Sequence, residues 1–341
     1  MVRLKSIFLA ITLAAAALCS CDKVHEFPEK GREIDPTDIS AEVEVTCQIQ
    51  LEVEKIVTKS DTPSTRPDED LSKYARRYTV NIYEDGKEGL TTVFSDIFFQ
   101  NIEETSPLRF NAKLHTKKYK ILVWMDYVLK GSGNDLYYIT SAGLNSIHVP
   151  DAGAYSVNSD LKDAQTILYS VDLSTSTEWF QHIVIDVPLQ RPVAKLTFEA
   201  TDFEEFAKKI GYDGPLEQLI GNYTAKVTYN GYLATGFNAV TQKLNDASVG
   251  YGFSSVPWFP EVKALPRLGF DYVFVNGESS SMTVSVTILD KDGKVVNSVE
   301  GITVPTYRGK ETIVRMKFFT REYSPGIGID PGFDGEFNVY V

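Results

Sequence analysis

The sequence is poor in cysteine and in long apolar runs, and both scarcities restrict the fold. It has three cysteines, Cys19, Cys21 and Cys47, among 341 residues. We expect Cys19 to be removed with an N-terminal leader and Cys21 to be lipidated, so only Cys47 remains for the folded part and we expect no intramolecular disulfide. The apolar run Ile7–Leu18 is too short to cross a bilayer as a helix, which takes roughly twenty residues. We therefore expect a fold that is held by its core alone.

Catalytic signatures are also scarce. The sequence contains no HExxH, G-x-S-x-G, P-loop or Rossmann fingerprint. The segment Asp290–Gly293 resembles the start of a calcium loop but lacks the later ligands, so a hairpin turn explains it better. Nothing points to a carboxylate pair for glycoside hydrolysis. The four histidines are scattered: His25, His115, His148 and His182. We predict a protein that is not an enzyme, with no metal site and no cofactor.

The charge balance bears on partners. The net charge is -12, which argues against nucleic acid as a partner and keeps the surface soluble. At the same time 43% of the residues are hydrophobic, enough to build a large core. The composition is typical of an exported globular protein.

The N-terminal residues have the organisation of a lipoprotein leader. Arg3 and Lys5 precede the apolar run, and Leu18-Cys19-Ser20-Cys21 follows the pattern of a lipobox. This pattern predicts a signal peptide over residues 1–20 and acylation of Cys21, by which the protein is anchored in a membrane. The alternative is an ordinary signal peptide followed by a chance cysteine. Residues 21–40 are polar and contain prolines, which predicts a flexible lipidated tether or, equally, an ordinary disordered terminus.

A strong alternation of apolar and polar residues follows the tether. It predicts a long, half-buried β-strand with Cys47 as a core thiol on its apolar face. The apolar positions are Val43, Val45, Cys47, Ile49, Leu51 and Val53. A polar loop is predicted from Lys59 to Arg77, and a second strand begins at Tyr78.

Short strands separated by turn-rich segments continue through the chain and favour an all-β fold. They are predicted at 119–128, 135–139, 181–187, 193–200, 223–229, 272–275, 282–289 and 312–320. Asn230-Gly231, Asn276-Gly277 and Asp292-Gly293 are turn signals. We predict two tandem antiparallel β-sandwiches, 41–187 and 188–341, with the boundary near Pro188.

One short helix is predicted in the second half. Thr201 and Glu204 fit a capping box, and apolar residues repeat at helical spacing until Gly211. The apolar positions are Phe203, Phe206, Ala207 and Ile210.

The last residues alternate again. Phe337, Val339 and Val341 are predicted on one face of an extended segment, and Phe333 has the same parity. This segment is either a strand that is donated to another subunit or the last strand of its own domain.

The tryptophans offer a second type of site. Trp124 lies in a strongly apolar strand and is predicted to be a core residue. Trp179 and Trp258 lie in loop-like sequence, where they could contact a glycan or pack beneath the loops.

Several short motifs occur in a characteristic order. The lipobox and the long first strand are followed by Tyr119–Tyr127, by Arg191-Pro-Val-Ala-Lys-Leu196, and by Arg308–Val314 with Phe318–Thr320. In this order the chain resembles the fimbrillin-like lipoproteins of the type V pilin superfamily, which form surface fimbriae of Gram-negative bacteria. The resemblance implies transthyretin-like sandwiches in a pilus subunit, or an accessory or anchor subunit, with a role in adhesion.

The same resemblance implies assembly by strand exchange. In that family an Arg- or Lys-specific protease removes the first strand, and a neighbour's C-terminal segment fills the groove by β-augmentation. The strand from Val43 to Val53 matches the removed piece, and Phe337, Val339 and Val341 match the donor. Arg76 or Arg77 is the favoured cut. Lys59 and Arg66 are the other candidates, although Arg66 precedes Pro67.

The implied partners are other copies of the chain or related pilin subunits, and host or bacterial surface ligands. The implied location is the cell surface, lipid-anchored in the outer membrane or released into fimbriae. The alternative function is a monomeric surface lipoprotein that binds glycans or proteins, for which Trp179 and Trp258 are the candidate contacts.

Overall fold

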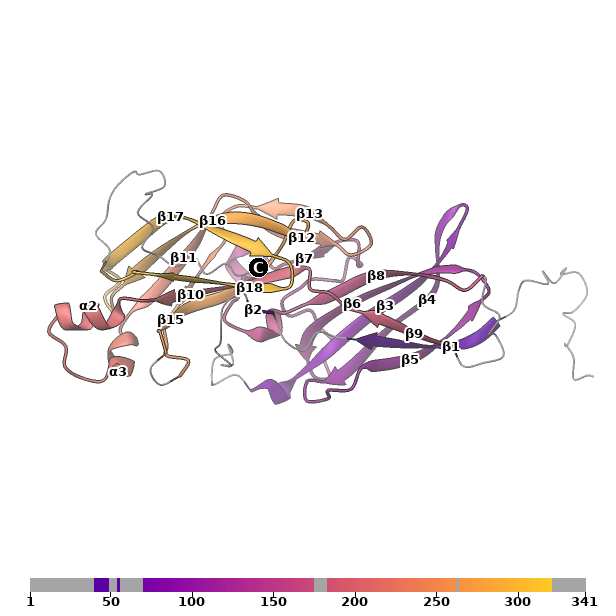
Figure 1. Cartoon of the computed structure of the whole chain (residues 1–341), viewed down its shortest axis with the longest axis horizontal. Coiled ribbons are helices and arrows are strands. Elements are labelled where there is room, and N and C mark those ends of the chain that lie inside the picture. Colours follow the sequence, from indigo (N-terminus) through magenta and orange to yellow (C-terminus); the bar gives the residue numbers. More distant parts are fainter. Residues whose placement is uncertain (1–39, 49–53, 56–69, 175–182, 262–263, 321–341) are drawn as a thin grey trace, which may run out of the picture. The chain divides into compact units, whose positions relative to one another are not determined.

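The computed structural model describes residues 40–48, 54–55, 70–174, 183–261 and 264–320. Strands make up most of this part of the chain (Figure 1). Several predictions lie outside the described residues: the signal peptide, Cys21, the tether, Lys59, Arg66, Trp179, the C-terminal segment from residue 321, and Ile49, Leu51 and Val53 of the first strand.

The strands, in chain order, are β1 Ser40–Gln48, β2 Glu54–Lys55, β3 Tyr74–Gly86, β4 Gly89–Asn101, β5 Leu108–His115, β6 Lys118–Leu129, β7 Ile147–His148, β8 Gln165–Asp172, β9 Ile183–Pro188, β10 Val193–Ala200, β11 Thr224–Asn230, β12 Leu233–Asn238, β13 Lys243–Ser248, β14 Gly252–Ser255, β15 Arg267–Phe274, β16 Ser279–Leu289, β17 Val295–Tyr307 and β18 Lys310–Met316. The helices are α2 Phe203–Lys209 and α3 Leu216–Ile220, with the 3₁₀ turns η1 Leu71–Lys73, η2 Ala152–Ala154 and η3 Asp160–Lys162. Neither helix is long and apolar enough to cross a membrane, and the same holds for the 3₁₀ turns among the described residues.

Two sheets enclose the smaller of two hydrophobic cores. One has the strand order β5-β1-β9 and the other β4-β3-β6-β8. Alternate residues of these strands point inward, as the pleat requires, and form a common buried cluster: Val43, Val45, Cys47, Tyr78, Val80, Ile82, Phe110, Ala112, Leu114, Tyr119, Ile121, Val123, Met125, Leu173, Ile185, Val187 and Leu189. The strand that was predicted to begin at Tyr78 is β3, and it begins four residues earlier, at Tyr74.

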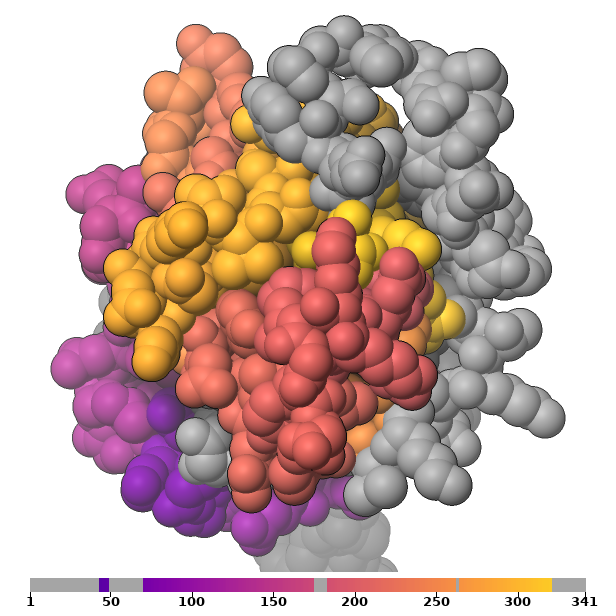
Figure 2. Space-filling view, turned by 90° about the vertical axis from the view of Figure 1, so that its left-hand side faces the viewer, coloured from indigo at the N-terminus to yellow at the C-terminus, as the bar shows by residue number. Residues whose placement is uncertain are grey.

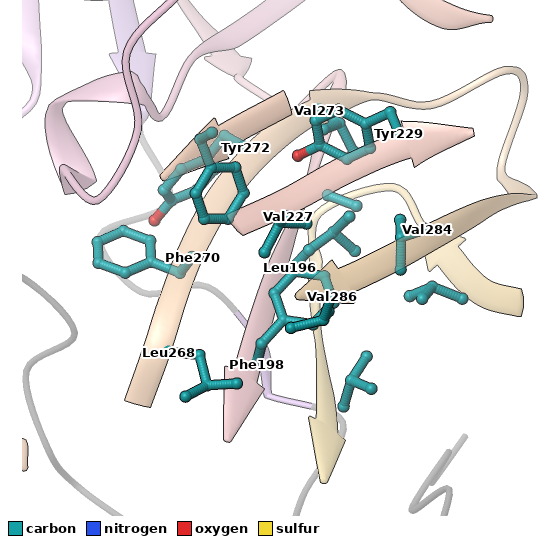
Figure 3. Packing of buried hydrophobic residues seen from close by; sticks show 14 of the residues in the cluster. Leu196, Phe198, Val227, Tyr229, Leu268, Phe270, Tyr272, Val273, Val284 and Val286 are labelled. Atoms are coloured by element: carbon teal, nitrogen blue, oxygen red, sulfur yellow. The ribbon is translucent and has the colours of Figure 1, made fainter. Parts of the chain in front are cut away.

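The larger core lies among three further sheets, β15-β10-β18-β2, β14-β11-β16-β17 and β13-β12-β7. Figure 3 shows part of it, where Leu196 and Phe198 of β10 pack with Val227 of β11 and with Val284 and Val286 of β16. The prediction of an all-β sandwich fold is thus confirmed. Most strand pairs are antiparallel, but β1 with β9, β10 with β18, and β18 with β2 are parallel.

The turn predictions agree with the backbone. Gly231, Gly277 and Gly293 all have positive φ, at 102°, 71° and 78°. Glycine adopts this conformation without the steric cost that a Cβ would bring. By contrast, the strand predicted at 135–139 is wrong, because only Ile139 bridges to His148 there.

The start of helix α2 also differs from the prediction. The N-cap is Asp202 rather than Thr201, and its side chain makes no capping bond. Its carboxylate instead accepts backbone N–H groups of Phe318 and Phe319 at 3.0 and 2.9 Å. Figure 2 shows this helical region, in red, beside the yellow end of the described chain. The predicted capping box is therefore wrong, since the residue next to it serves a long-range contact.

Helix α2 otherwise buries the predicted face, with Phe203, Phe206 and Ala207 in the larger core. Ile210 is the exception and is 49% exposed. The chain then forms a second short helix, α3, which was not predicted.

The domain boundary near Pro188 stays a prediction. Residues on both sides of it enter the larger core, because Tyr138, Leu144 and Ile147 belong to that cluster although they precede β9. Leu189, which follows β9, belongs to the smaller core.

Candidate functional site

Strand β1 lies in the middle of its sheet, with β5 on one side and β9 on the other. It runs parallel to β9, with Val43 opposite Ile183, Val45 opposite Ile185 and Cys47 opposite Val187. The pairing continues beyond the strand, where the N–H of Leu189 donates to the carbonyl of Gln48 at 2.8 Å. A strand in this position completes the backbone hydrogen bonds of two neighbours at once.

The apolar face of β1 is removed from solvent completely. Val43, Val45 and Cys47 each have 0% exposure. They pack in the smaller core with Val80 of β3 and Ile121 of β6. At about 1.5–3 kcal/mol for a fully buried aliphatic side chain, these three residues are a large part of what holds β1 in place.

Aromatic stacking lines the β5 side of the strand. The ring of Phe110 lies 5.4 Å from that of Phe94 and 4.9 Å from that of Phe98, both on β4. Ring pairs at such distances stabilise the fold by more than the burial of their surface alone. The β5 flank is therefore tied to the facing sheet independently of β1.

Cys47 has the environment of a structural thiol. Burial raises its pKa to about 12. The reactive form of cysteine is the thiolate, so this thiol is unreactive at neutral pH in the folded protein. The interpretation of Cys47 as a core residue agrees with this environment.

The outward face of β1 makes a weaker contact. The guanidinium of Arg109 on β5 lies 3.3 Å from the carboxylate of Glu44. Arg109 is 65% exposed, so solvent screens this pair strongly. This ion pair therefore adds little to the attachment of β1, although Thr46 on the same face is only 4% exposed.

This arrangement can bind a strand. Among the described residues no group of three or more His, Cys, Asp or Glu side chains could hold a metal ion. If β1 left, the facing edges of β5 and β9 would lose their partner and the pockets of Val43, Val45 and Cys47 would open. Unpaired edges of this kind are templates for another strand.

The favoured cleavage residues are not in a loop. Arg76 and Arg77 lie in β3, which pairs with β4 on one side and β6 on the other. Their exposures are 5% and 4%. A protease needs an accessible, extended segment, and in the folded chain neither residue offers one.

The side chains of these two arginines are engaged as well. Arg77 donates to both oxygens of Asp126, from Nε at 2.9 Å and from a terminal nitrogen at 2.6 Å. It also contacts Asp135 at 2.8 Å. Arg76 donates to the carbonyls of Ile102 and Glu104 at 2.6 and 2.7 Å. The loop predicted up to Arg77 is therefore wrong at its end, because distant carboxylates neutralise the charge of Arg77 and distant carbonyls accept hydrogen bonds from Arg76, which allows both to be buried.

The tryptophans divide as follows. Trp124 has 0% exposure and packs edge-on to Tyr138, so the prediction of a core residue is confirmed. Trp258 packs against the larger core and lies 6.4 Å from the ring of Phe270. Its position agrees with loop packing rather than with an exposed sugar platform.

Sequence comparison places the chain in a family. The profile of a family of unknown function, DUF6562, matches residues 36–341. The chain belongs to the DUF6562 family. No curated protein matches the sequence of this DUF6562 member.

Solved structures similar to this DUF6562 protein include fimbrial proteins. The fimbrial anchor protein Mfa2 of Porphyromonas gingivalis is 13% identical, with a TM-score of 0.40, over 81% of this chain and 90% of that one. The tip fimbrial protein Mfa3 of the same organism is 12% identical, with a TM-score of 0.45, over 81% and 94%. A candidate adhesin of Bacteroides ovatus is 12% identical, with a TM-score of 0.43, over 81% and 89%.

The strand predicted at 181–187 is β9, but β5 and the pairing of β1 with β9 were not predicted. Strand β5 alternates well, with Phe110, Ala112 and Leu114 inward and Arg109, Asn111 and Lys113 outward. This alternation is visible in the sequence and could have identified the strand. The parallel pairing of β1 with β9 leaves no such local signal.

Proposed function

We propose that this chain is a non-enzymatic fimbrial subunit, or an accessory or anchor subunit, that assembles by exchange of its first strand. It is exported as a lipoprotein acylated at Cys21, and a protease then removes β1. The observation that carries the proposal is the burial of Val43, Val45 and Cys47 at 0% exposure in the middle of the sheet. A neighbour's strand would restore these contacts.

The sequence contains a segment of suitable pattern. Phe337, Val339 and Val341 would take the inward positions, and Glu336, Asn338 and Tyr340 the outward ones. If Phe337, Val339 and Val341 take the places of Val43, Val45 and Cys47, then Asn338 takes the place of Glu44 beside Arg109. With Phe333 included, four apolar side chains at about 1.5–3 kcal/mol each would offset much of the ordering cost.

The burial of Arg76 and Arg77 in β3 moves the proposed cut toward the N-terminus. Lys59 and Arg66 lie between β2 and η1 in the sequence, so cleavage at either would separate β1 and β2 from the rest of the chain and leave β3 intact. Lys59 is preferred, because a trypsin-like protease cuts poorly before Pro67.

The first experiment is N-terminal sequencing and intact-mass measurement of the protein recovered from its native cell surface. A new N-terminus at Ser60 or Pro67, in a ladder of SDS-resistant oligomers, is the expected result. A single acylated species that begins at Cys21 and runs as a monomer would refute the polymerising subunit. That outcome would leave the anchor or the ligand-binding lipoprotein.

Paired variants separate cleavage from folding. Lys59→Gln combined with Arg66→Gln should abolish processing, whereas Lys73→Gln, at an exposed side chain in η1, should not. On the donor segment Val339→Asp should stop assembly, and Asn338→Asp on the opposite parity should leave it intact. Equal effects of the two donor variants would contradict the proposed register.

A further inference from the structure

Lys162 and Asp271 form a pair that is closed off from solvent. Lys162 ends the turn η3, and Asp271 lies in β15. The Nζ atom of Lys162 is 2.5 Å from Oδ1 of Asp271, and the two side chains are 1% and 0% exposed. Burial of two opposite charges carries a large desolvation penalty. An amine and a carboxyl group are thus held together where neither ion is hydrated.

Burial favours the uncharged form of Lys162. It lowers the pKa of the ammonium, and the charge of Asp271 opposes this effect. The ring of Tyr155, whose centre lies 3.6 Å from Nζ, also opposes it, because an aromatic face attracts a cation. Transfer of one proton across the pair gives an amine and a carboxylic acid, both neutral and better suited to an apolar interior. A neutral lysine is a nucleophile.

The other oxygen of Asp271 faces two hydroxyl donors. Tyr155 donates to Oδ2 at 2.7 Å and Tyr229 at 2.5 Å, the latter residue being labelled in Figure 3. Burial raises the pKa of both hydroxyls, so they remain protonated donors. The backbone N–H of Tyr272 donates to Oδ1 at 2.8 Å. Two fixed donors on one carboxyl oxygen form the arrangement that stabilises negative charge during acyl transfer.

We propose that Lys162 and Asp271 condense to an intramolecular isopeptide bond. The lone pair of Nζ attacks Cγ, and the electrons of the Cγ=Oδ2 bond move onto Oδ2, where Tyr155 and Tyr229 stabilise them. The Cγ–Oδ1 bond then breaks, and Oδ1 leaves as water with the carboxyl proton and one amine proton. The reaction needs no oxidant or other reactant. Its barrier is lowered because the groups are already positioned, which is worth many orders of magnitude in related intramolecular reactions.

A second pair in the same region provides an internal control. Lys195 contacts Asp160 at the same 2.5 Å, but Asp160 is 29% exposed. Water reaches that carboxylate and stabilises its charge, so we expect this pair to remain ionic. The two pairs differ in burial and in where the tyrosines donate, rather than in distance: Tyr272 donates to Oδ1 of Asp160, the oxygen that contacts Lys195, whereas both tyrosines of Asp271 donate to the oxygen opposite the lysine.

The test is mass spectrometry of tryptic peptides from the folded full-length protein, denatured before digestion. The bond would block cleavage after Lys162 and join its peptide to the one containing Asp271, with the mass of one water lost. Cleavage after Lys195 should be normal. Complete cleavage after Lys162, even after prolonged incubation of the folded protein, would overturn the proposal and leave a buried ion pair.

Variants distinguish the chemistry from a structural role. Lys162→Arg keeps the charge but should give no linked peptide. Tyr229→Phe removes one donor to Oδ2 and should slow formation of the linked peptide on the order of 100-fold in a time course of freshly folded protein. The matched variant Tyr251→Phe removes a hydroxyl that contacts Pro150 instead and should not change the rate. If circular dichroism shows a native fold for Tyr229→Phe and the rate is unchanged, the assigned role of the tyrosines is wrong.

Discussion

Strand β1 and turn η3 are both packed into protein interior, but different interactions hold them. Alternating apolar side chains and backbone hydrogen bonds hold β1. Contacts between particular basic and acidic side chains hold the η3 region, where Lys162 contacts Asp271 and Asp163 contacts Arg191. The first set of contacts depends on a pattern of apolar residues at alternate positions. The second set requires particular partners, so η3 depends on residue identity where β1 depends on pattern.

The largest expected loss of stability is at the pair of Asp163 and Arg191, next to η3. Arg191 Nε donates to both oxygens of Asp163, at 2.9 and 3.0 Å. Arg191→Met leaves that carboxylate buried without its partner and should lower the free energy of unfolding by about 3–5 kcal/mol. Urea denaturation measures this loss. The double variant Arg191→Met, Asp163→Asn should recover most of it, and a loss below about 1 kcal/mol in the single variant would contradict a fixed η3.

A smaller effect is expected in β1. Val45→Ala removes two buried methyl groups and should cost about 2 kcal/mol, from roughly 0.8 kcal/mol per group plus the cavity. The matched control is Val184→Ala on β9, whose side chain is 50% exposed. Equal losses in the two variants would mean that the buried face of β1 does not hold the strand.

Because the Cys47 thiol is buried in the smaller core, the stability of the fold should fall at alkaline pH. The pKa of this thiol is about 12 in the folded chain against 9.0 for a free thiol. Below pH 9 both states keep the proton, but above it the unfolded state ionises first, so stability falls as pH rises. At pH 10 this difference in ionisation should lower the free energy of unfolding by about 1.4 kcal/mol. Cys47→Ala should lose less stability than the parent between pH 8 and pH 10 in urea denaturation, and identical losses would contradict the pKa.

The smallest effect is expected on the outer face of β1. Arg109→Gln removes the exposed pair with Glu44 and should change the free energy of unfolding by less than about 0.5 kcal/mol. The same denaturation experiment in low and high salt should show that any difference disappears as ions screen it. A loss as large as that of Val45→Ala would show that charge, rather than burial, fixes the strand.

The sequence allowed prediction of features with a local cause. Alternation located β1, β6 and β10, and the pairs Asn-Gly and Asp-Gly located turns with positive φ. Features with a distant cause were missed. In the sequence Arg76 and Arg77 look like loop residues. In the fold Arg77 contacts Asp126, and Arg76 contacts a carbonyl just beyond β4. Asp202 likewise binds the backbone of residues more than a hundred positions away.

The candidate site was predictable to the same extent. The inward face of β1 follows from its period of two, but its neighbours β5 and β9 do not, because the parallel pairing joins segments far apart in the sequence. The buried pair Lys162 and Asp271 could not have been predicted either. Both are charged residues in ordinary sequence, and only the fold places them together without water.

The parallel alignment of β1 with β9 has a directional consequence. A replacement that follows the course of β1 enters the sheet with one orientation only. Each subunit would then receive a segment at one place and supply one from another, a head-to-tail relation that does not close on itself. A fibre built in this way has two chemically different ends, and units could join it at one of them while the other stays attached to the cell.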